Sequence, residues 1–393
     1  MNNFGHYLNT KVPIRICIVF GTRPEAIKLA PVIIALWKET DFLVKTIVTG
    51  QHREMLDQVL QRFGLIPEYD LNIMTPGQNL AEITSRILLG ITPILQSEKP
   101  DLLIVHGDTT TTFASSLAAF YQNIPVAHVE AGLRTGDKWQ PYPEELNRIL
   151  TGNISDLHFA PTLQAKENLL RENVSPESIF VTGNTVIDAL YYCLPENYKK
   201  NNIVPNITRT AEKLILVTAH RRENWGRPLE NIVQALQAIL RDNPGVRMLI
   251  PVHLNPSVQK LFRESLGSEP RVDLVEPFDY QQMVVAMAQA YLIISDSGGI
   301  QEEAPALGKP VLVLRNKTER PEAILAGTVR LVGTEPENIR KATNLLLQDD
   351  NEYQKMAQAV NPYGDGKASA RIVAGLKYHF GLLPEKPIDF INI

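Results

Sequence analysis

The feature that most constrains the fold of this chain is a regular alternation of apolar runs with stretches of helical periodicity. The runs are mainly Val, Ile and Leu with few polar residues between them, which is typical of strands covered on both faces. In the intervening stretches, such as residues 229–240, apolar residues recur every three to four positions. This alternation predicts an α/β fold of parallel sheets with helices on both faces. The expected strands are Ile14–Phe20, Leu43–Val48, Leu102–Val105, Pro125–Val129, Leu157–Ala160, Ile179–Thr182, Leu214–Thr218, Val246–Val252, Val272–Val275, Leu292–Ser295, Val311–Leu314 and Val329–Val332.

The chain is longer, at 393 residues, than one hydrophobic core usually supports, so we expect two domains. Residues 191–210 are polar and turn-prone, with roughly six expected strands on either side. We predict Rossmann-like domains over residues 1–188 and 189–372, and a C-terminal piece over residues 373–393. Ligands of open α/β sheets bind beyond the carboxyl ends of the strands, so two such domains facing each other predict a cleft.

Bulk composition disfavours several classes of protein. A formal net charge of −4 leaves no dominant basic character, so a nucleic-acid-binding protein is not expected. No apolar run approaches the ~18 residues of a membrane span. The polar N-terminus lacks the apolar core of a signal peptide. Cys17 and Cys193 lie far apart without metal-ligand spacing, so we expect a cytoplasmic protein with neither disulfide nor bound metal.

The segment Asp296-Ser297-Gly298-Gly299 follows an expected buried strand and precedes a short helical stretch. A strand, a tight turn and a helix start bring free backbone N–H groups together, which predicts a phosphate-binding turn. The glycines permit a close approach of the anion. We expect Glu302 and Glu303 in or near the first helical turn, where one carboxylate reaches a ribose hydroxyl. The alternative is a capped turn that binds nothing.

A second turn, Gly21 to Lys28, follows the first expected strand. Pro24 suits the first turn of a helix, because the N–H that it lacks would be unpaired there. We expect Arg23 and Lys28 to lie near the strand-end edge, although solvated side chains would explain them equally. Only Gly21 is present from the glycine-rich dinucleotide fingerprint, so a hydride-transferring dehydrogenase is disfavoured.

Four further ionisable residues, Asp108, Glu130, Glu144 and His220, lie at expected strand ends or helix starts. Any one of them alone would be explained as a helix cap or a surface charge. Together they are expected to line one pocket, where carboxylates repel one another and the pKa of at least one rises. Paired acid–base chemistry requires such groups. Cations recur as well, including Arg221 and Arg320, and would hold a diphosphate leaving group.

Several motifs, in this order, resemble one known family. They are Gly-Thr-Arg-Pro-Glu-Ala at 21–26, His-Gly-Asp at 106–108, Glu-Ala-Gly-Leu-Arg-Thr at 130–135, Pro-Glu-Glu-Leu-Asn-Arg at 143–148, His-Arg-Arg-Glu-Asn at 220–224, Pro-Val-His at 251–253, Asp-Ser-Gly-Gly-Ile-Gln-Glu-Glu-Ala-Pro at 296–305 and Thr-Glu-Arg-Pro-Glu at 318–322. They are similar to the bacterial non-hydrolysing UDP-N-acetylglucosamine 2-epimerases. The resemblance runs from about residue 14 to about residue 380.

The resemblance implies a glycosyltransferase-B-like fold, with the final helix packed back on the first domain. It implies interconversion of UDP-N-acetylglucosamine (UDP-GlcNAc) and UDP-N-acetylmannosamine (UDP-ManNAc) without a cofactor. The implied route eliminates UDP to give 2-acetamidoglucal and then adds UDP back. The product would supply N-acetylmannosamine for cell-surface polysaccharide.

The resemblance also implies a role for individual residues. Asp108, Glu130, Glu144 and His220 would be catalytic. The substrate would be bound by Arg23, Lys28, Phe278, Met283, Ser297, Gly298, Gly299, Glu303 and Arg320. Methionine at 283 departs from the aromatic residue of the family, which leaves packing rather than ring stacking against uracil.

Bacterial members of the family suggest a homodimer and an allosteric second UDP-GlcNAc. The matching positions are Gln51, Glu54, Arg221 and His253, with Gly77 where some members have arginine. Other functions stay open at this point. A glycosyltransferase would share the fold and require an acceptor, a hydrolysing epimerase would release free sugar, and a nucleotide-sugar sensor would bind without turnover.

Overall fold

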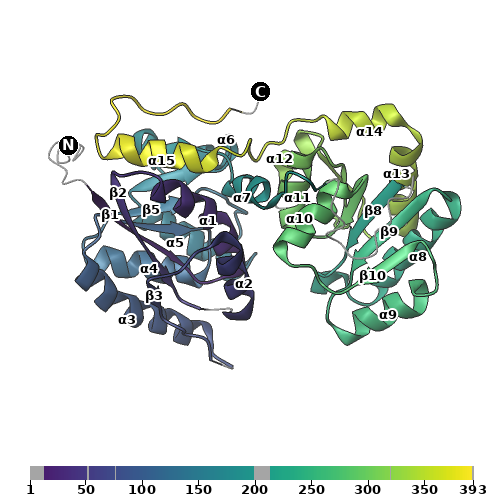
Figure 1. The fold of residues 1–393 in the computed structure, drawn as a ribbon, viewed down its shortest axis with the longest axis horizontal. Coiled ribbons are helices and arrows are strands. Elements are labelled where there is room, and N and C mark those ends of the chain that lie inside the picture. The colour runs from purple at the N-terminus through teal and green to yellow at the C-terminus, as the bar shows by residue number, and fades with distance from the viewer. Residues whose placement is uncertain (1–12, 51–52, 76, 199–212, 319, 392–393) are drawn as a thin grey trace. The chain divides into compact units, whose positions relative to one another are not determined.

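The computed structural model describes residues 13–50, 53–75, 77–198, 213–318 and 320–391 (Figure 1). The chain forms two compact units, of which the first runs to Ala189 and also contains Tyr363–Ile391. The second comprises Leu190–Pro362. The chain therefore passes between the units at 189/190 and 362/363, whereas the sequence predicted boundaries after 188 and 372.

The first unit is built on a parallel sheet of seven strands in the order β3-β2-β1-β4-β5-β6-β7. Its strands are β1 (Ile14–Phe20), β2 (Phe42–Val48), β3 (Tyr69–Asp70), β4 (Leu102–His106), β5 (Val126–Val129), β6 (Leu157–Ala160) and β7 (Ile179–Val181). Its helices are α1 (Arg23–Trp37), α2 (Arg53–Phe63), α3 (Leu80–Glu98), α4 (Thr110–Tyr121), α5 (Glu144–Ile154), α6 (Leu163–Arg171), α7 (Thr185–Cys193), which continues into the second unit, and α15 (Ala368–His379), with a 3-10 turn at Pro176–Ser178.

The second unit is built on a parallel sheet of six strands in the order β10-β9-β8-β11-β12-β13. Its strands are β8 (Lys213–Thr218), β9 (Val246–Pro251), β10 (Val272–Val275), β11 (Leu292–Ser295), β12 (Val311–Val313) and β13 (Val329–Leu331). Its helices are α8 (Arg227–Asp242), α9 (Pro256–Leu266), α10 (Tyr280–Gln289), α11 (Gly298–Glu303), α12 (Pro321–Leu325), α13 (Pro336–Gln348) and α14 (Asp350–Ala357), with 3-10 turns at Arg222–Asn224 and Ala304–Leu307.

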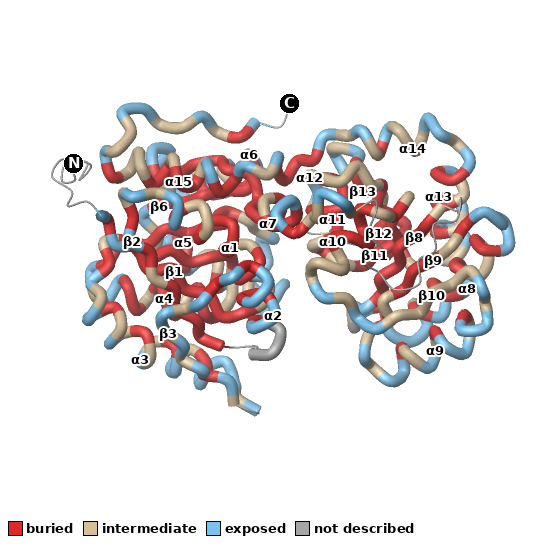
Figure 2. Tube along the Cα trace, in the orientation of Figure 1, coloured by how far each residue is buried: buried red, intermediate tan, exposed pale blue. Residues whose placement is uncertain are grey.

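The α/β prediction with two parallel sheets is confirmed, and each expected strand is present with ends that differ by at most one residue. One strand was missed: β3 is two residues long and pairs only with Ile47 and Val48 at the edge of the first sheet. The prediction of six strands in the N-terminal half was therefore wrong by one. Central strands are buried on both faces, as the red sheet interiors of Figure 2 show.

The C-terminal helix α15 packs on α1 within the first unit. Asp188 of α7 accepts hydrogen bonds from the N–H groups of Ala368 and Ser369 at 3.1 and 2.8 Å, so a side chain from another helix caps the start of α15. Leu376 on α15 is fully buried. Lys377 contacts carboxylates of Glu39 and Asp41 just beyond α1. The helix therefore covers apolar surface of the first unit.

Leu376→Ala should destabilise the first unit by about 2–5 kcal/mol, the range for truncating a buried leucine. Urea unfolding followed by circular dichroism measures the change. The control is Leu89→Ala on α3, where the side chain is 74% exposed and the expected change is within about 0.5 kcal/mol. Equal shifts for the two variants would contradict the packing described for α15.

Candidate functional site

Several of the predicted site residues lie where the strand order of each sheet reverses. In the first sheet β1 has β2 on one side and β4 on the other. In the second sheet β8 has β9 on one side and β11 on the other. Such a reversal leaves an opening beyond the carboxyl ends of the two central strands. The loops after β1, β4, β8 and β11 carry the polar motifs of the sequence.

A buried carboxylate, Glu25, organises the loops after β1 and β4. Its Oε2 accepts hydrogen bonds from the N–H groups of Gly21 and Thr22 at 3.0 and 2.8 Å and from the Thr22 hydroxyl. Its Oε1 accepts from the hydroxyls of Thr109 and Thr112 at 2.7 and 3.1 Å. The carboxylate thus completes a capping box at the start of α1 and ties two loops together. Sequence analysis placed Glu25 in the motif but assigned it no role.

The second carboxylate, Glu130, is paired with Lys28 of α1 and accepts a hydrogen bond from the Asn184 amide at 2.8 Å. Burial would raise the pKa of Glu130, but Lys28, His106 and Asn184 together outweigh it and lower the pKa to about 2. Glu130 has a φ of +63°, a left-handed conformation that is uncommon outside glycine. Lys28 therefore contacts a predicted catalytic carboxylate.

Asp108 follows β4 and forms an ion pair with Arg148 of α5. Burial and the charge of Glu130 raise its pKa, whereas Arg148 and Lys28 oppose the rise. Arg148 also lies 3.2 Å from Glu145, which is buried and accepts hydrogen bonds from the N–H groups of Thr135 and Gly136. The pKa values of Asp108 and Glu130 are thus pushed in opposite directions.

Glu144, predicted as catalytic, begins α5 and is partly exposed. Its neighbour Glu145 is the one that is buried among polar partners.

His106 ends β4, and burial lowers its pKa to about 4, so the ring is neutral at pH 7. Its Nε2 lies 3.9 Å from Glu130 Oε2, so the ring places positive charge beside this carboxylate only when it is protonated in acid.

In the second unit, Asp296 fixes the loop after β8. Its Oδ2 accepts hydrogen bonds from the N–H groups of His220 and Arg221, both at 2.9 Å, and from the Asn224 amide at 3.0 Å. Its Oδ1 lies 3.0 Å from His220 Nδ1. Burial opposes ionisation of Asp296, but His220, Arg221 and Asn224 outweigh it and lower the pKa. The Asp296 carboxylate therefore fixes the backbone that carries His220, whose side chain is about half exposed.

The turn Ser297–Gly299 leads into α11 and lies against Arg320. A Cβ atom at Gly298 would lie 2.6 Å from Arg320 Nη1, so only glycine allows the guanidinium this close to the turn. Arg320 Nε donates a 2.6 Å hydrogen bond to Glu302. Glu302 and Glu303 end this six-residue helix, so they lie directly after its first turn rather than in it.

Glu303 is buried and accepts a 2.7 Å hydrogen bond from the Tyr280 hydroxyl of α10. Phe278 lies just before α10 and Met283 one turn after Tyr280, both partly buried. Tyr280 was missed by sequence analysis. The sequence feature that could have indicated Tyr280 is its position one helical turn before Met283, on a helix that already carried a predicted site residue.

The remaining predicted residues are more dispersed. Arg23 begins α1, is partly exposed, and makes no ion pair within the described part of the chain. The Arg221 side chain lies 3.9 Å from Glu223, and His253 lies beside the Trp225 ring at 6.2 Å. Gln51 falls outside the described residues, as does the side chain of Glu54. The predicted allosteric set therefore stays a prediction.

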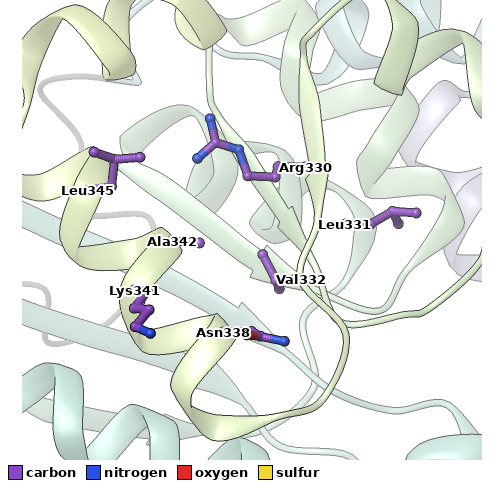
Figure 3. A pocket seen from close by; sticks show the side chains of 7 residues that line it. All are labelled: Arg330, Leu331, Val332, Asn338, Lys341, Ala342 and Leu345. Carbon is purple, nitrogen blue, oxygen red and sulfur yellow. The ribbon is translucent and has the colours of Figure 1, made fainter.

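One surface pocket of about 320 Å³ lies between β13 and α13 (Figure 3). Arg330 of the edge strand β13 and Val332 just beyond it face the helix there, while Leu331 points away. None of the predicted site residues lines it.

Across the described ranges, no group of three or more His, Cys, Asp or Glu is arranged to hold a metal ion. No described helix has both the length and the apolar character needed to cross a membrane.

Comparison with known proteins places this chain in a family. The model of the UDP-N-acetylglucosamine 2-epimerase family matches residues 34–377. A Salmonella typhimurium UDP-N-acetylglucosamine 2-epimerase is 56% identical over 369 residues, which cover 92% of this chain and 98% of the relative.

Comparison with solved structures supports the same family. A UDP-GlcNAc 2-epimerase from Neisseria meningitidis, bound to UDP-GlcNAc, is 51% identical with a TM-score of 0.85, covering 93% of this chain and 100% of that one. Another UDP-N-acetylglucosamine 2-epimerase structure is 50% identical with a TM-score of 0.89, covering 97% and 100%. The glycotransferase of kitacinnamycin, at 13% identity and a TM-score of 0.63, shares the fold alone. The chain belongs to the UDP-N-acetylglucosamine 2-epimerase family.

Proposed function

We propose that this protein inverts carbon 2 of UDP-GlcNAc to give UDP-ManNAc, reversibly and without hydrolysis. The observation that carries the proposal is the pair Asp108 and Glu130, two carboxylates of one strand-end site with pKa values shifted apart. Environments that separate the pKa values of two groups suit them to different roles in proton transfer. Membership of the family supports the substrate.

The reaction must avoid direct deprotonation of carbon 2, whose hydrogen is not acidic. Breaking the bond between carbon 1 and the diphosphate oxygen first places positive charge on the sugar ring. A base then removes the proton at carbon 2, and the C–H electron pair becomes the double bond of 2-acetamidoglucal. Return of a proton to the other face, with attack of the diphosphate oxygen on carbon 1, completes the inversion without any cofactor.

Departure and return of UDP are the roles we assign to the second unit. Ser297, Gly298 and Gly299 offer backbone N–H groups to the diphosphate, and Arg320 lies beside them. Asp296 orients His220, whose exposed edge contacts the leaving oxygen. Preorganised donors stabilise charge as it develops, because they need no reorientation during the reaction. Glu303 binds the ribose, and Phe278 and Met283 pack near the uracil.

Proton transfer is the role that we assign to the first unit. Asp108, whose pKa is raised by burial, exchanges the proton at carbon 2. Glu130, held ionised by Lys28, stabilises positive charge on the ring and serves the opposite face. Because the two carboxylates interact, their titration belongs to the pair rather than to either residue. Glu144 and Arg23 complete the groups around the sugar and phosphates.

Three further features are proposed on the family resemblance. We propose a homodimer, regulation by a second UDP-GlcNAc near Gln51, Glu54, Arg221 and His253, and a cytoplasmic location. The location is supported by Cys17 and Cys193, which are both buried free thiols.

Turnover in deuterated water tests the reaction. UDP-GlcNAc alone should give UDP-ManNAc that carries deuterium at carbon 2, because the removed proton exchanges with solvent before a proton returns. Proton NMR measures both product and label. Release of free N-acetylmannosamine would indicate a hydrolysing enzyme, a requirement for an acceptor would indicate a transferase, and binding without product would indicate a sensor.

Replacement of Asp108 tests the assignment of the proton-transfer group. Asp108→Asn should lower kcat by roughly 10²–10⁴, the usual contribution of a general acid or base. Calorimetric binding of UDP should be retained, because UDP is assigned to the second unit. Asp101→Asn, at an exposed aspartate of the first unit, is the control and should leave kcat unchanged. Wild-type turnover by Asp108→Asn would contradict the assignment.

The charge assigned to Glu130 predicts a pH dependence of stability. Its pKa is about 2 in the folded protein against an ordinary 4.5, so its stabilising contribution is present above pH 4.5 and is lost as pH falls toward 2. Glu130→Gln removes this contribution. The gap in unfolding free energy between wild type and variant, a few kcal/mol at pH 7, should therefore narrow at pH 3 in urea titrations. A gap that stays constant with pH would show that Glu130 is not held ionised.

A further inference from the structure

Asn184 follows β7, and its uncharged side-chain amide donates a hydrogen bond to the Glu130 carboxylate. We propose that Asn184 is a positioning residue, which holds Glu130 Oε2 in the orientation required for proton transfer and ring stabilisation. This inference rests on the proposed function. It deepens that function by naming a residue that acts through Glu130 and does not itself touch the substrate.

Both ends of the Asn184 amide are engaged. Nδ2 donates to Glu130 Oε2 at 2.8 Å, across 54 residues of sequence. Oδ1 accepts from the Val186 N–H at 3.0 Å, in the first turn of α7. The Val186 contact fixes which end of the amide is the oxygen, so the end that faces Glu130 must be the N–H donor. The donor is therefore set by local structure and not by the carboxylate.

The backbone of Asn184 is held as well. Its N–H donates to the Tyr363 carbonyl at 2.6 Å, and the residue is only 3% exposed. Gly183 packs so closely on the returning chain that a Cβ there would lie 3.4 Å from the Gly364 Cα. Asn184 thus lies where the two segments that connect the units touch inside the first unit. A donor held in this way is preorganised.

Glu130 needs such support. Its left-handed backbone, φ +63°, costs free energy in a residue with a side chain, and surrounding contacts must maintain it. Lys28 supplies charge through a flexible stem and a donor that rotates freely, whereas the planar amide of Asn184 fixes one direction. His106, 3.9 Å away and neutral, adds no donor toward the same oxygen.

Asn184→Ser separates positioning from structure. Serine can still accept the Val186 N–H, as it does at helix starts, but is too short to reach Glu130. We expect kcat for epimerisation to fall about 10- to 100-fold, the factor that corresponds to one hydrogen bond to a charged group. KM should change little, because substrate affinity is assigned to other residues. Asn168→Ser is the matched control, since the Asn168 amide donates at 2.9 Å to the Gly132 carbonyl and not to Glu130.

Asn184→Asp supplies a second readout. The aspartate side chain matches asparagine in shape, but it can donate a hydrogen bond to Glu130 only when it is protonated. The kcat of this variant relative to wild type should recover as pH is lowered, while that of Asn184→Ser should not. Lys28, His106 and Asp108 face the same group and are present in all variants, so a recovery seen only with Asn184→Asp is due to the carboxyl introduced at position 184.

The inference is overturned if Asn184→Ser keeps wild-type kcat while the wild type epimerises normally. Failure of the wild type to invert carbon 2 would instead contradict the proposed function. In that case a double-mutant cycle of Asn184→Ser and Glu130→Ala in urea unfolding measures the coupling free energy between the two side chains. A non-additive cycle supports positioning of the Glu130 side chain by Asn184, and strict additivity overturns it.

Discussion

The buried ion pair of Lys28 and Glu130 is the interaction on which the first unit's site depends. Taking two charges out of water costs several kcal/mol per ion, so the pair persists only with good geometry and further hydrogen bonds. Asn184 supplies one of these. Because loss of either partner would leave a buried charge unpaired, α1, the end of β5 and the loop after β7 are held in one arrangement.

Each unit also uses one buried carboxylate to fix the loops at the point where its strand order reverses. Glu25 gathers N–H and hydroxyl donors from the loops after β1 and β4. Asp296 gathers N–H groups of His220 and Arg221 after β8. Both loops are thereby rigid before any ligand arrives, which lowers the reorganisation that binding and catalysis require.

The burial of a segment decides whether its structure can be predicted from the sequence. Strands covered on both faces must be apolar, so their runs were visible, whereas β3 makes two residue pairs at an edge and needs no such run. The strand-end rule placed Asp108, Glu130 and His220 just after strands, and they follow β4, β5 and β8. It named Glu144 and not Glu145, the buried neighbour, because the sequence alone does not show which of two adjacent residues at a helix start packs inward. Asn184 and Arg148 reach partners 54 and 40 residues away, contacts that no local pattern encodes.

The pairing of charges bears on how such a site holds an anion. Arg320 is paired with Glu302, Arg148 with Asp108, and Lys28 with Glu130. Each of these three cations is therefore largely compensated by its carboxylate partner. A paired guanidinium still presents its other N–H donors, and its carboxylate partner fixes their direction. Such an ion pair therefore lowers the affinity for an anion but fixes the geometry in which the anion would bind. In the proposed reaction, in which UDP leaves and returns, fixed geometry is favourable, since uniformly tight binding of the ground state would not raise kcat.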